Sequence, residues 1–242
     1  MIPESSDLLI EEDSWLTSIL GIRSERIRIQ SIERYISYWS ENRVEYPFFT
    51  TIKVDGPLYE NPQQQLDGLR FIQEMKLYRW EGLPNHNREN YNIRKYSPDD
   101  RSAILGITEN AFHRSRFHSD ARFSIELAEK IKREWILNNL TSRPNILTLV
   151  AEVDNVVVGY SSLLISSGSI TIDLIATAKS MRGKGIGASL IRESQQFASL
   201  NTKELLVGTQ SNSPANSLYL RSGFTNHAIQ NVWHHSNRTG FI

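Results

Sequence analysis

Three glycines alternate through the stretch Arg182-Gly183-Lys184-Gly185-Ile186-Gly187. Residues 169–177, just before it, predict a β-strand, and residues 188–199, just after it, predict an amphipathic helix. Glycines at a strand-to-helix turn let backbone N–H groups approach an anion at the positive end of the helix dipole. Arg182 and Lys184 add two cationic side chains to the same turn. The pattern therefore predicts a site for a phosphate-bearing ligand.

The spacing of these glycines excludes two common nucleotide-binding loops. A P-loop requires Gly-Lys-Ser or Gly-Lys-Thr, whereas Lys184 is followed by Gly185. A dinucleotide fingerprint requires Gly-x-Gly-x-x-Gly with an acidic residue about twenty positions later, whereas this loop reads Gly-x-Gly-x-Gly. Taken alone, the loop also fits a turn that only packs a helix against a sheet.

Asn212, Ala215 and Tyr219 provide a second signal. A helix that begins near Ser213-Pro214 places Ala215 and Tyr219 on one face. Ser213 is suited to cap that helix, Pro214 fits its first turn, and Gly223 suits the position just beyond its end. Tyr219 alone also fits a core aromatic, and Asn212 alone fits a turn. Their occurrence together, at this distance after the glycine loop, favours a functional site.

The two motifs together carry a family resemblance. Arg-x-x-Gly-x-Gly at a strand-to-helix turn, followed by Asn212-x-x-Ala215-x-x-x-Tyr219-x-x-x-Gly223-Phe224, resembles the GNAT superfamily of acyl-CoA N-acyltransferases over about residues 91–242. The resemblance implies a mixed α/β sheet of the acyl-CoA N-acyltransferase fold, preceded by a smaller α/β unit. It also implies acetyl-CoA as the co-substrate and no metal.

Under that resemblance, backbone amides of residues 183–188 hold the CoA pyrophosphate. The strand at 175–177 pairs with the pantetheine arm and polarises the thioester carbonyl through a backbone N–H. Asn212 bonds the pantetheine amides. The implied cofactor-binding residues are Ile175, Ala176, Thr177, Arg182, Gly183, Lys184, Gly185, Ile186, Gly187, Ala188 and Asn212.

The reaction that the resemblance implies needs an acid and a base. A tyrosine with a pKa of about 10 stays protonated at neutral pH and is able to donate to a thiolate whose conjugate acid has a pKa of about 8.5. Tyr219 is therefore expected to be the general acid. Asp173 is a candidate base, because strand alternation places it on the same face as Ile175 and Thr177. A solvated Asp173, a water chain and deprotonation assisted by the substrate remain open alternatives.

A narrower resemblance concerns the acceptor. Residues 111–118 (Ala-Phe-His-Arg-Ser-Arg-Phe-His), 207–210 and 231–234 are similar to the acetyltransferases of dTDP-fucosamine, a nucleotide-linked 4-amino-4,6-dideoxy sugar. That similarity implies that Arg116 meets a diphosphate or a sugar hydroxyl, and that His118 contacts the sugar or relays the amine proton. A surface ion pair for Arg116 and a structural role for His118 are the alternatives. The acceptor could equally be a protein N-terminus, an aminoglycoside or a small metabolite, and a non-catalytic acyl-CoA-binding module is the other open reading.

The chain divides near its middle. Residues 83–90 are polar and contain a proline, so they predict a linker between a small α/β domain at 1–82 and the acetyltransferase domain at 91–242. The first domain shows no chemistry of its own and could supply pocket walls or a dimer surface. Its predicted elements are strands at 26–30 and 48–54 and helices at 31–42 and 61–75.

The region after the linker predicts a richer order of elements. Asp154-Asn155 is a tight hairpin signal, and Ser97-Pro98-Asp99-Asp100 resembles a helix start. The predicted strands cover 91–96, 146–153, 156–165, 169–177, 204–209 and 226–234. The other predicted helices cover 101–112, 124–139 and 214–221. An antiparallel meander that enters a β-α-β-α-β tail favours a mixed sheet over a doubly wound one.

Composition limits the partners. The 242 residues include 27 basic and 27 acidic side chains, so no global charge favours nucleic acid or an anionic membrane. The chain has no cysteine, which excludes disulfides, thiolate metal sites and cysteine nucleophiles. The N-terminus lacks the pattern of a signal peptide, and the apolar runs are too short for a membrane span. We therefore expect a cytoplasmic protein whose partner is a small-molecule amine, with a homodimer left open.

Overall fold

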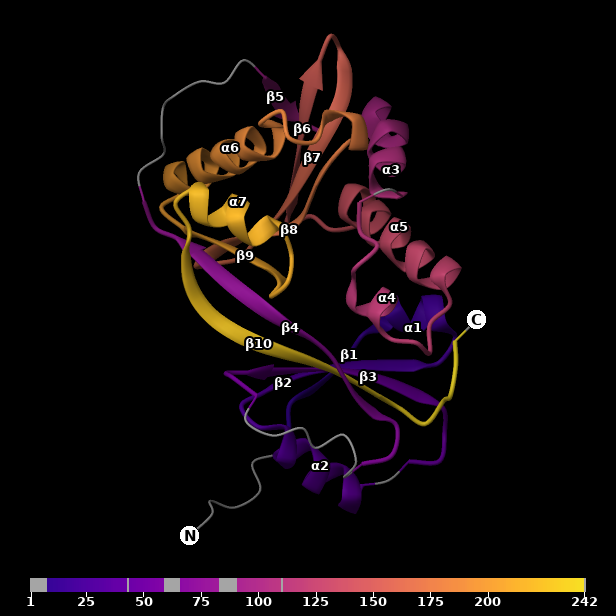
Figure 1. Cartoon of the computed structure of the whole chain (residues 1–242). Helices are drawn as coiled ribbons and strands as arrows, with labels where there is room; N and C mark the ends of the chain where they lie inside the picture. Colours follow the sequence, from indigo (N-terminus) through magenta and orange to yellow (C-terminus); the bar gives the residue numbers. More distant parts are fainter. Residues whose placement is uncertain (1–7, 43, 59–65, 83–90, 110, 242) are drawn as a thin grey trace. The chain divides into compact units, whose positions relative to one another are not determined.

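The computed structural model describes residues 8–42, 44–58, 66–82, 91–109 and 111–241, and the chain divides into two compact units (Figure 1). The first unit comprises Met1–Met75, Arg116–Leu127 and Ala228–Ile242, and the second comprises Lys76–Ser115 and Ala128–His227. Two long strands, β4 (Leu69–Trp80) and β10 (Thr225–Ser236), contribute residues to both units, as does helix α5 (Ile125–Thr141), whose first three residues belong to the first unit.

These units do not coincide with the domains at 1–82 and 91–242 predicted from the sequence. The C-terminal residues belong to the first unit because β10 pairs antiparallel with β3 (Phe48–Asp55), with Gln230 opposite Asp55 and Ser236 opposite Phe49. The end of β4 belongs to the second unit, where β4 is the neighbour of β9 (Glu204–Gln210). The predicted linker, 83–90, lies outside the described residues.

In the first unit the strand order is β1-β2-β3-β10. The remaining elements of this unit are β1 (Ile10–Glu12), α1 (Ser14–Leu20), β2 (Arg23–Ile29), α2 (Ile32–Glu41) and α4 (Arg116–Ser119). Strands β2 and β3 are parallel, as expected when a helix connects two neighbouring strands. Helix α2 covers one face of this sheet with Tyr35, Ile36 and Trp39, and the large buried partner from β10 is Trp233.

The opposite face of this sheet carries a buried polar group among aromatic rings. Asp120 accepts hydrogen bonds from His234 Nδ1 at 2.8 Å and from Arg122 Nη2 at 2.8 Å. The ring centroid of His234 lies 4.8 Å from that of Phe49 and 5.8 Å from that of Phe117. Burial lowers the pKa of His234 to about 4, although the Asp120 carboxylate opposes the shift. The imidazole is therefore neutral at physiological pH, with its proton on Nδ1.

In the second unit the strand order is β4-β9-β8-β7-β6-β5. The bounds are β5 (Asn92–Lys95), α3 (Arg101–Glu109), α5 (Ile125–Thr141), β6 (Ile146–Val153), β7 (Val156–Ile165), β8 (Ser169–Thr177), α6 (Ile186–Leu200) and α7 (Ala215–Arg221), with short 3-10 turns at Pro98–Asp100 and Lys179–Met181. Strands β5 to β8 run antiparallel, and β8 and β9 run parallel. The predicted mixed α/β sheet is confirmed.

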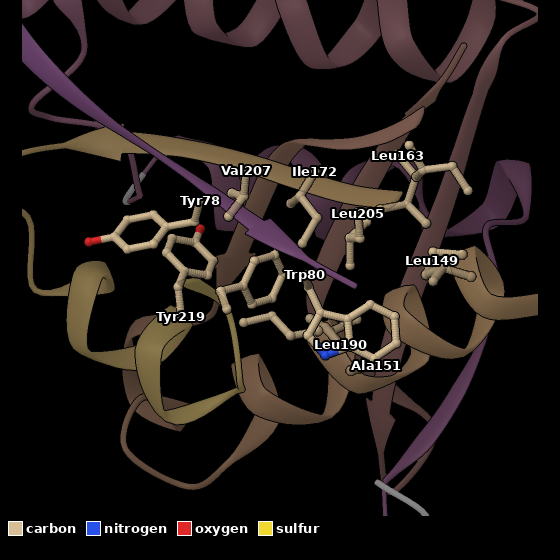
Figure 2. Packing of buried hydrophobic residues seen from close by; sticks show 14 of the residues in the cluster. Tyr78, Trp80, Leu149, Ala151, Leu163, Ile172, Leu190, Leu205, Val207 and Tyr219 are labelled. Carbon is tan, nitrogen blue, oxygen red and sulfur yellow. The ribbon is translucent and has the colours of Figure 1, made fainter. Parts of the chain in front are cut away.

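Helices cover both faces of this second sheet (Figure 1). Leu190 and Ile191 of α6 pack into one cluster, together with Tyr78 and Trp80 from β4 (Figure 2). On the other face, α3 and α5 pack through a second cluster that includes Ile104 and Ile136. Gly159 on β7 permits the close approach of α6, because a Cβ at this position would lie 3.0 Å from Ile186 Cγ2.

Most of the predicted elements are confirmed to within a few residues. The hairpin at Asp154-Asn155 has both residues at positive φ, 50° and 60°, as a tight two-residue turn requires. Ser97 and Asp100 form a reciprocal capping box at the predicted helix start. The predicted helix at 61–75 is wrong, because Leu69–Trp80 form a strand, and the rest of that prediction includes residues outside the described part. No helix among the described residues is both long and apolar enough to cross a membrane.

Candidate functional site

The glycine stretch forms an open turn at the start of α6. Gly185 is the N-cap of this 15-residue helix, with φ of 85° and ψ of −7°, and Gly183 has φ of 78°. Both values lie in the left-handed region that glycine adopts without strain. The first intrahelical bond is donated by Ser189 N to Gly185 O, so the amides of residues 186–188 have no carbonyl partner within the helix. The helix therefore presents three N–H groups at its positive end.

Strand β8 separates from β9 near this turn. The two strands pair from Ser169 to Ile172 against Glu204 to Val207, and no pairs follow, although both strands continue within the described residues. On its other side, β8 remains paired with β7 up to Thr177, which lies opposite Gly159. Residues 173–177 thus have no strand partner on the β9 side among the described residues, and these include the positions 175–177 predicted to bind pantetheine. Arg182 Nε donates to Thr177 O at 3.4 Å, which ties the loop to the end of β8.

Helix α7 packs directly on the glycine turn. A Cβ on Gly187 would lie only 3.3 Å from Leu218 Cδ2, so a larger residue there would require the Leu218 side chain to shift by a few tenths of an ångström. Gln195 Nε2 of α6 donates to Ser222 O at the end of α7 at 2.7 Å. Gly223 follows at φ of 81°, as predicted for the residue after the helix. These contacts bring the two sequence motifs together in one unit.

Tyr219 lies on α7 with 3% of its surface exposed. Its ring packs beside that of Tyr78 (Figure 2), with the ring centroids 5.8 Å apart. The ring centroid of Phe224 lies 5.7 Å from that of Tyr219. Burial raises the pKa of Tyr219 above its usual value. The phenol is therefore protonated throughout the physiological pH range, as a proton donor must be before it acts.

Asparagines occupy two positions around the start of α7. Asn212 is exposed in the turn between β9 and α7, so its side chain is accessible to a ligand. Asn216, on α7, is half-buried, and its side chain bonds backbone carbonyls of this turn. Asn216 was not identified from the sequence. Ser213 Oγ accepts from Ala215 N at 3.2 Å, so it caps the helix as predicted, while Pro214 occupies the formal N-cap position.

The strand alternation used to place Asp173 beside Ile175 is wrong. A β-bulge interrupts the pairing of β7 and β8, because Leu163 pairs with Ile172 and Ser162 with Leu174, which leaves Asp173 without a partner. The Asp173 Oδ2 atom accepts from Trp135 Nε1 at 2.8 Å and from Asn139 Nδ2 at 2.7 Å, both on α5.

Ile175, by contrast, packs against the cluster that contains α6. The bulge therefore turns Asp173 and Ile175 to opposite faces of the sheet. Through these hydrogen bonds Asp173 joins β8 to α5. Its role as a base stays a prediction.

The residues predicted to bind the acceptor belong to the first unit. Arg116 and His118 lie on α4, and the Arg116 guanidinium carbon lies 4.4 Å from the ring centroid of Phe117. The residues predicted to hold the cofactor all belong to the second unit. The roles of Arg116 and His118 stay predictions.

A family model matches the segment of the chain that contains the glycine turn and Tyr219. Residues 144–226 match the model of the acetyltransferase (GNAT) domain, and this segment contains β8, the glycine turn, α6, β9 and α7. Residues 144–226 form a GNAT domain. The resemblance expected from the paired motifs is thereby confirmed, and the GNAT domain assigns the glycine turn to an acetyltransferase fold.

One curated relative extends the comparison. Spore coat polysaccharide biosynthesis protein SpsD from Bacillus subtilis (strain 168) is 32% identical over 130 residues. The aligned region is 53% of this chain and 45% of that relative, so the match spans less than half of the longer protein.

Solved structures share the fold over most of the chain. A conserved protein of unknown function from Staphylococcus epidermidis is similar with a TM-score of 0.62 and 15% identity, over 89% of this chain and 85% of the other. The GCN5-related N-acetyltransferase from Sphaerobacter thermophilus has a TM-score of 0.58 and 15% identity, over 90% of this chain and 74% of the other. A tandem GNAT protein from the clavulanic acid biosynthesis pathway has a TM-score of 0.56 and 12% identity, over 89% and 76%. At these identities the likeness shows the GNAT fold alone.

Proposed function

We propose that this protein transfers the acetyl group of acetyl-CoA to a primary amine by direct attack, with Tyr219 as the general acid. The observation that carries the proposal is the contact between α7 and the glycine turn, where Gly187 accommodates Leu218. The contact supports the proposal because the helix that carries the buried, protonated Tyr219 packs on the N-terminal end of α6, where the pyrophosphate would bind.

The proposed binding of acetyl-CoA uses backbone groups first. The amides of residues 186–188 and the left-handed turn at Gly183 and Gly185 would hold the pyrophosphate. The unpaired edge of β8 at 175–177 would hold the pantetheine arm by strand addition, and Asn212 would bond its amides. An N–H on the same edge would stabilise the oxyanion, a contribution of about 3 kcal/mol for one preorganised donor.

The proposed reaction then balances as follows. The neutral amine nitrogen attacks the thioester carbonyl carbon, a C–N bond forms and the C–S bond breaks. Tyr219 gives its proton to the departing thiolate, so CoA leaves as the thiol. The amine loses one proton to a base, for which Asp173, a water chain and the substrate itself are the candidates. The products are an amide and CoA.

The acceptor that we propose is the amino group of a nucleotide-linked 4-amino-4,6-dideoxy sugar. Two observations support this choice: the similarity of residues 111–118 to sugar acetyltransferases of that class, and a relative whose name refers to polysaccharide biosynthesis. Arg116 would meet the diphosphate or a sugar hydroxyl, and His118 would contact the sugar. Other amines remain outcomes of the test below.

The proposal is tested by thiol release from acetyl-CoA with a panel of nucleotide-linked 4-amino and 3-amino sugars, a peptide and an aminoglycoside. We expect turnover with a 4-amino sugar, and Tyr219→Phe should lower kcat by about a hundredfold or more while acetyl-CoA binding is nearly kept. Turnover confined to the peptide or the aminoglycoside would refute the sugar acceptor. Binding of acetyl-CoA without turnover on any amine would favour a non-catalytic binding module.

A further inference from the structure

We propose that Tyr78 is a positioning residue for Tyr219, supplied by a strand that precedes the GNAT segment. The inference rests on the proposed function, because it assigns Tyr78 a part in the step that Tyr219 performs. Tyr78 lies on β4, outside residues 144–226, which match the GNAT domain.

Tyr78 is bonded to the helix that carries the acid. Its hydroxyl donates to Asn216 Oδ1 of α7 at 2.7 Å, and only 1% of the Tyr78 surface is exposed. Asn216 and Tyr219 are three positions apart, so they lie on the same face of the helix one turn apart. The ring of Tyr78 packs beside the ring of Tyr219 at a centroid distance of 5.8 Å. One β4 side chain therefore contacts the acid and also bonds the residue one turn before it.

Asn216 extends this support to the turn before α7. Its Nδ2 atom donates to Gln210 O at 3.0 Å, to Ser211 O at 3.0 Å and to Ser213 O at 2.7 Å. The Tyr78 hydroxyl fixes which way the amide faces, because it requires the Oδ1 atom to point toward β4 while Nδ2 points toward the turn. The turn has three bonds of its own to Asn216, whereas the bond from the Tyr78 hydroxyl, together with ring packing against Tyr219, orients α7 relative to β4.

This difference predicts a specific kinetic signature. Removal of the Tyr78 hydroxyl should leave the turn that holds Asn212 in place, so the KM for acetyl-CoA should change little. The same removal should let α7 shift against β4 and displace the Tyr219 hydroxyl, which affects only the chemical step. A loss in kcat without a matching rise in KM is therefore the expected result for a positioning residue.

The test compares Tyr78→Phe with a matched control, Tyr160→Phe. Tyr160 is also fully buried in the second unit, and its hydroxyl shares a hydrogen bond with Thr108 Oγ1 at 2.8 Å, but it belongs to the cluster of α3 and α5 rather than to the cluster that contains Tyr219. Both variants lose one buried tyrosine hydrogen bond, so their melting temperatures should fall by similar amounts. We expect Tyr78→Phe to lower kcat by about tenfold with the acetyl-CoA KM within about twofold, and Tyr160→Phe to change kcat by less than about twofold.

A double variant separates action through Tyr219 from independent action. If Tyr78 acts only by placing Tyr219, then the Tyr78→Phe/Tyr219→Phe protein should have the kcat of Tyr219→Phe alone, within about twofold. A kcat lower by the product of the two single effects would overturn the positioning role and leave Tyr219 as the acid. An equal loss in kcat for Tyr78→Phe and Tyr160→Phe would also overturn it. An unchanged kcat in Tyr219→Phe would refute the proposed acid, and the role of Tyr78 with it.

Discussion

Removal of the first 90 residues should unfold the acetyltransferase part of this chain rather than release it as a domain. The structure assigns Lys76–Trp80 to the same compact unit as the glycine turn, and two of these residues, Tyr78 and Trp80, are 1% and 5% exposed in its core. Trp80 also packs over the turn after α7, since a Cβ on Gly223 would lie 3.7 Å from Trp80 Cδ1. A chain that begins at residue 91 lacks both aromatic side chains.

The size of the loss follows from the core residues removed. Deletion of a buried aromatic side chain costs about 3–5 kcal/mol, so the two together remove about 6–10 kcal/mol. A domain of this size is stable by about 5–15 kcal/mol in total. The truncated chain also leaves the β9 edge without its β4 neighbour and removes β3, the partner of β10. We therefore expect the fragment 91–242 to be largely unfolded at 25 °C.

The assay is thermal unfolding of the fragment by circular dichroism, together with acetyl-CoA binding by calorimetry. A cooperative transition and an acetyl-CoA Kd equal to that of the full chain would refute the reasoning. A matched pair of variants in the full chain tests the same point without truncation. Trp80→Ala and Trp39→Ala each remove a buried tryptophan and should each cost about 3–5 kcal/mol. Only Trp80→Ala should also weaken acetyl-CoA binding, because the residues predicted to hold the cofactor belong to the second unit, whereas Trp39 belongs to the core of the first unit.

Three further predictions concern single sites. Gly183→Ala would force an alanine into the left-handed backbone region at a cost of about 1–2 kcal/mol. We therefore expect the Kd for acetyl-CoA, measured by calorimetry, to rise by about tenfold. Gly168→Ala, where an added Cβ also meets nothing within 4 Å, should leave the Kd for acetyl-CoA unchanged. An equal rise in Kd for the two variants would contradict the proposed binding of the pyrophosphate by the glycine turn.

Asp173→Asn should lower the stability to urea by about 1–3 kcal/mol, because Trp135 and Asn139 lose their shared carboxylate. A large loss of kcat with the stability unchanged would instead identify Asp173 as the base. Burial lowers the pKa of both His234 and His235 to about 4 from 6.5, so the unfolded chain binds the extra protons as the pH falls. Urea unfolding should therefore show full stability above about pH 6.5 and a loss of about 2 kcal/mol per histidine between pH 7 and pH 5; a flat profile would contradict the neutral imidazoles.

The features that sequence predicts well here are local ones. Asp154-Asn155 specifies a two-residue hairpin because both residues tolerate positive φ. In the structure both residues have positive φ, at the turn between β6 and β7. The glycine turn and the helix after it follow from residue types within a few positions of each other. The predicted positions of Tyr219 on a short helix and of Gly223 after it are confirmed for the same reason.

The features that sequence missed depend on contacts distant along the chain. Residues 61–75 contain Gln, Glu and Met, which favour a helix by propensity, but Leu69–Trp80 join a sheet instead. The bulge at Asp173 follows from pairing with β7, and simple alternation along β8 cannot reveal it. The contact between Tyr78 and Asn216 spans 138 positions, so no local pattern could have indicated it. The run Leu77-Tyr78-Arg79-Trp80, with two aromatics two apart, was the one available signal of a strand with a buried face.

The most direct test of the central claim is release of CoA thiol from acetyl-CoA in the presence of a nucleotide-linked 4-amino-4,6-dideoxy sugar. The wild-type protein should release thiol in step with formation of the N-acetyl sugar, seen by mass spectrometry. Tyr219→Phe should bind acetyl-CoA with nearly the same Kd but release thiol at about one hundredth of the wild-type rate or below. Equal rates for the two proteins would contradict the assignment of Tyr219 as the acid, and no acetylated sugar from the wild type would contradict the acceptor.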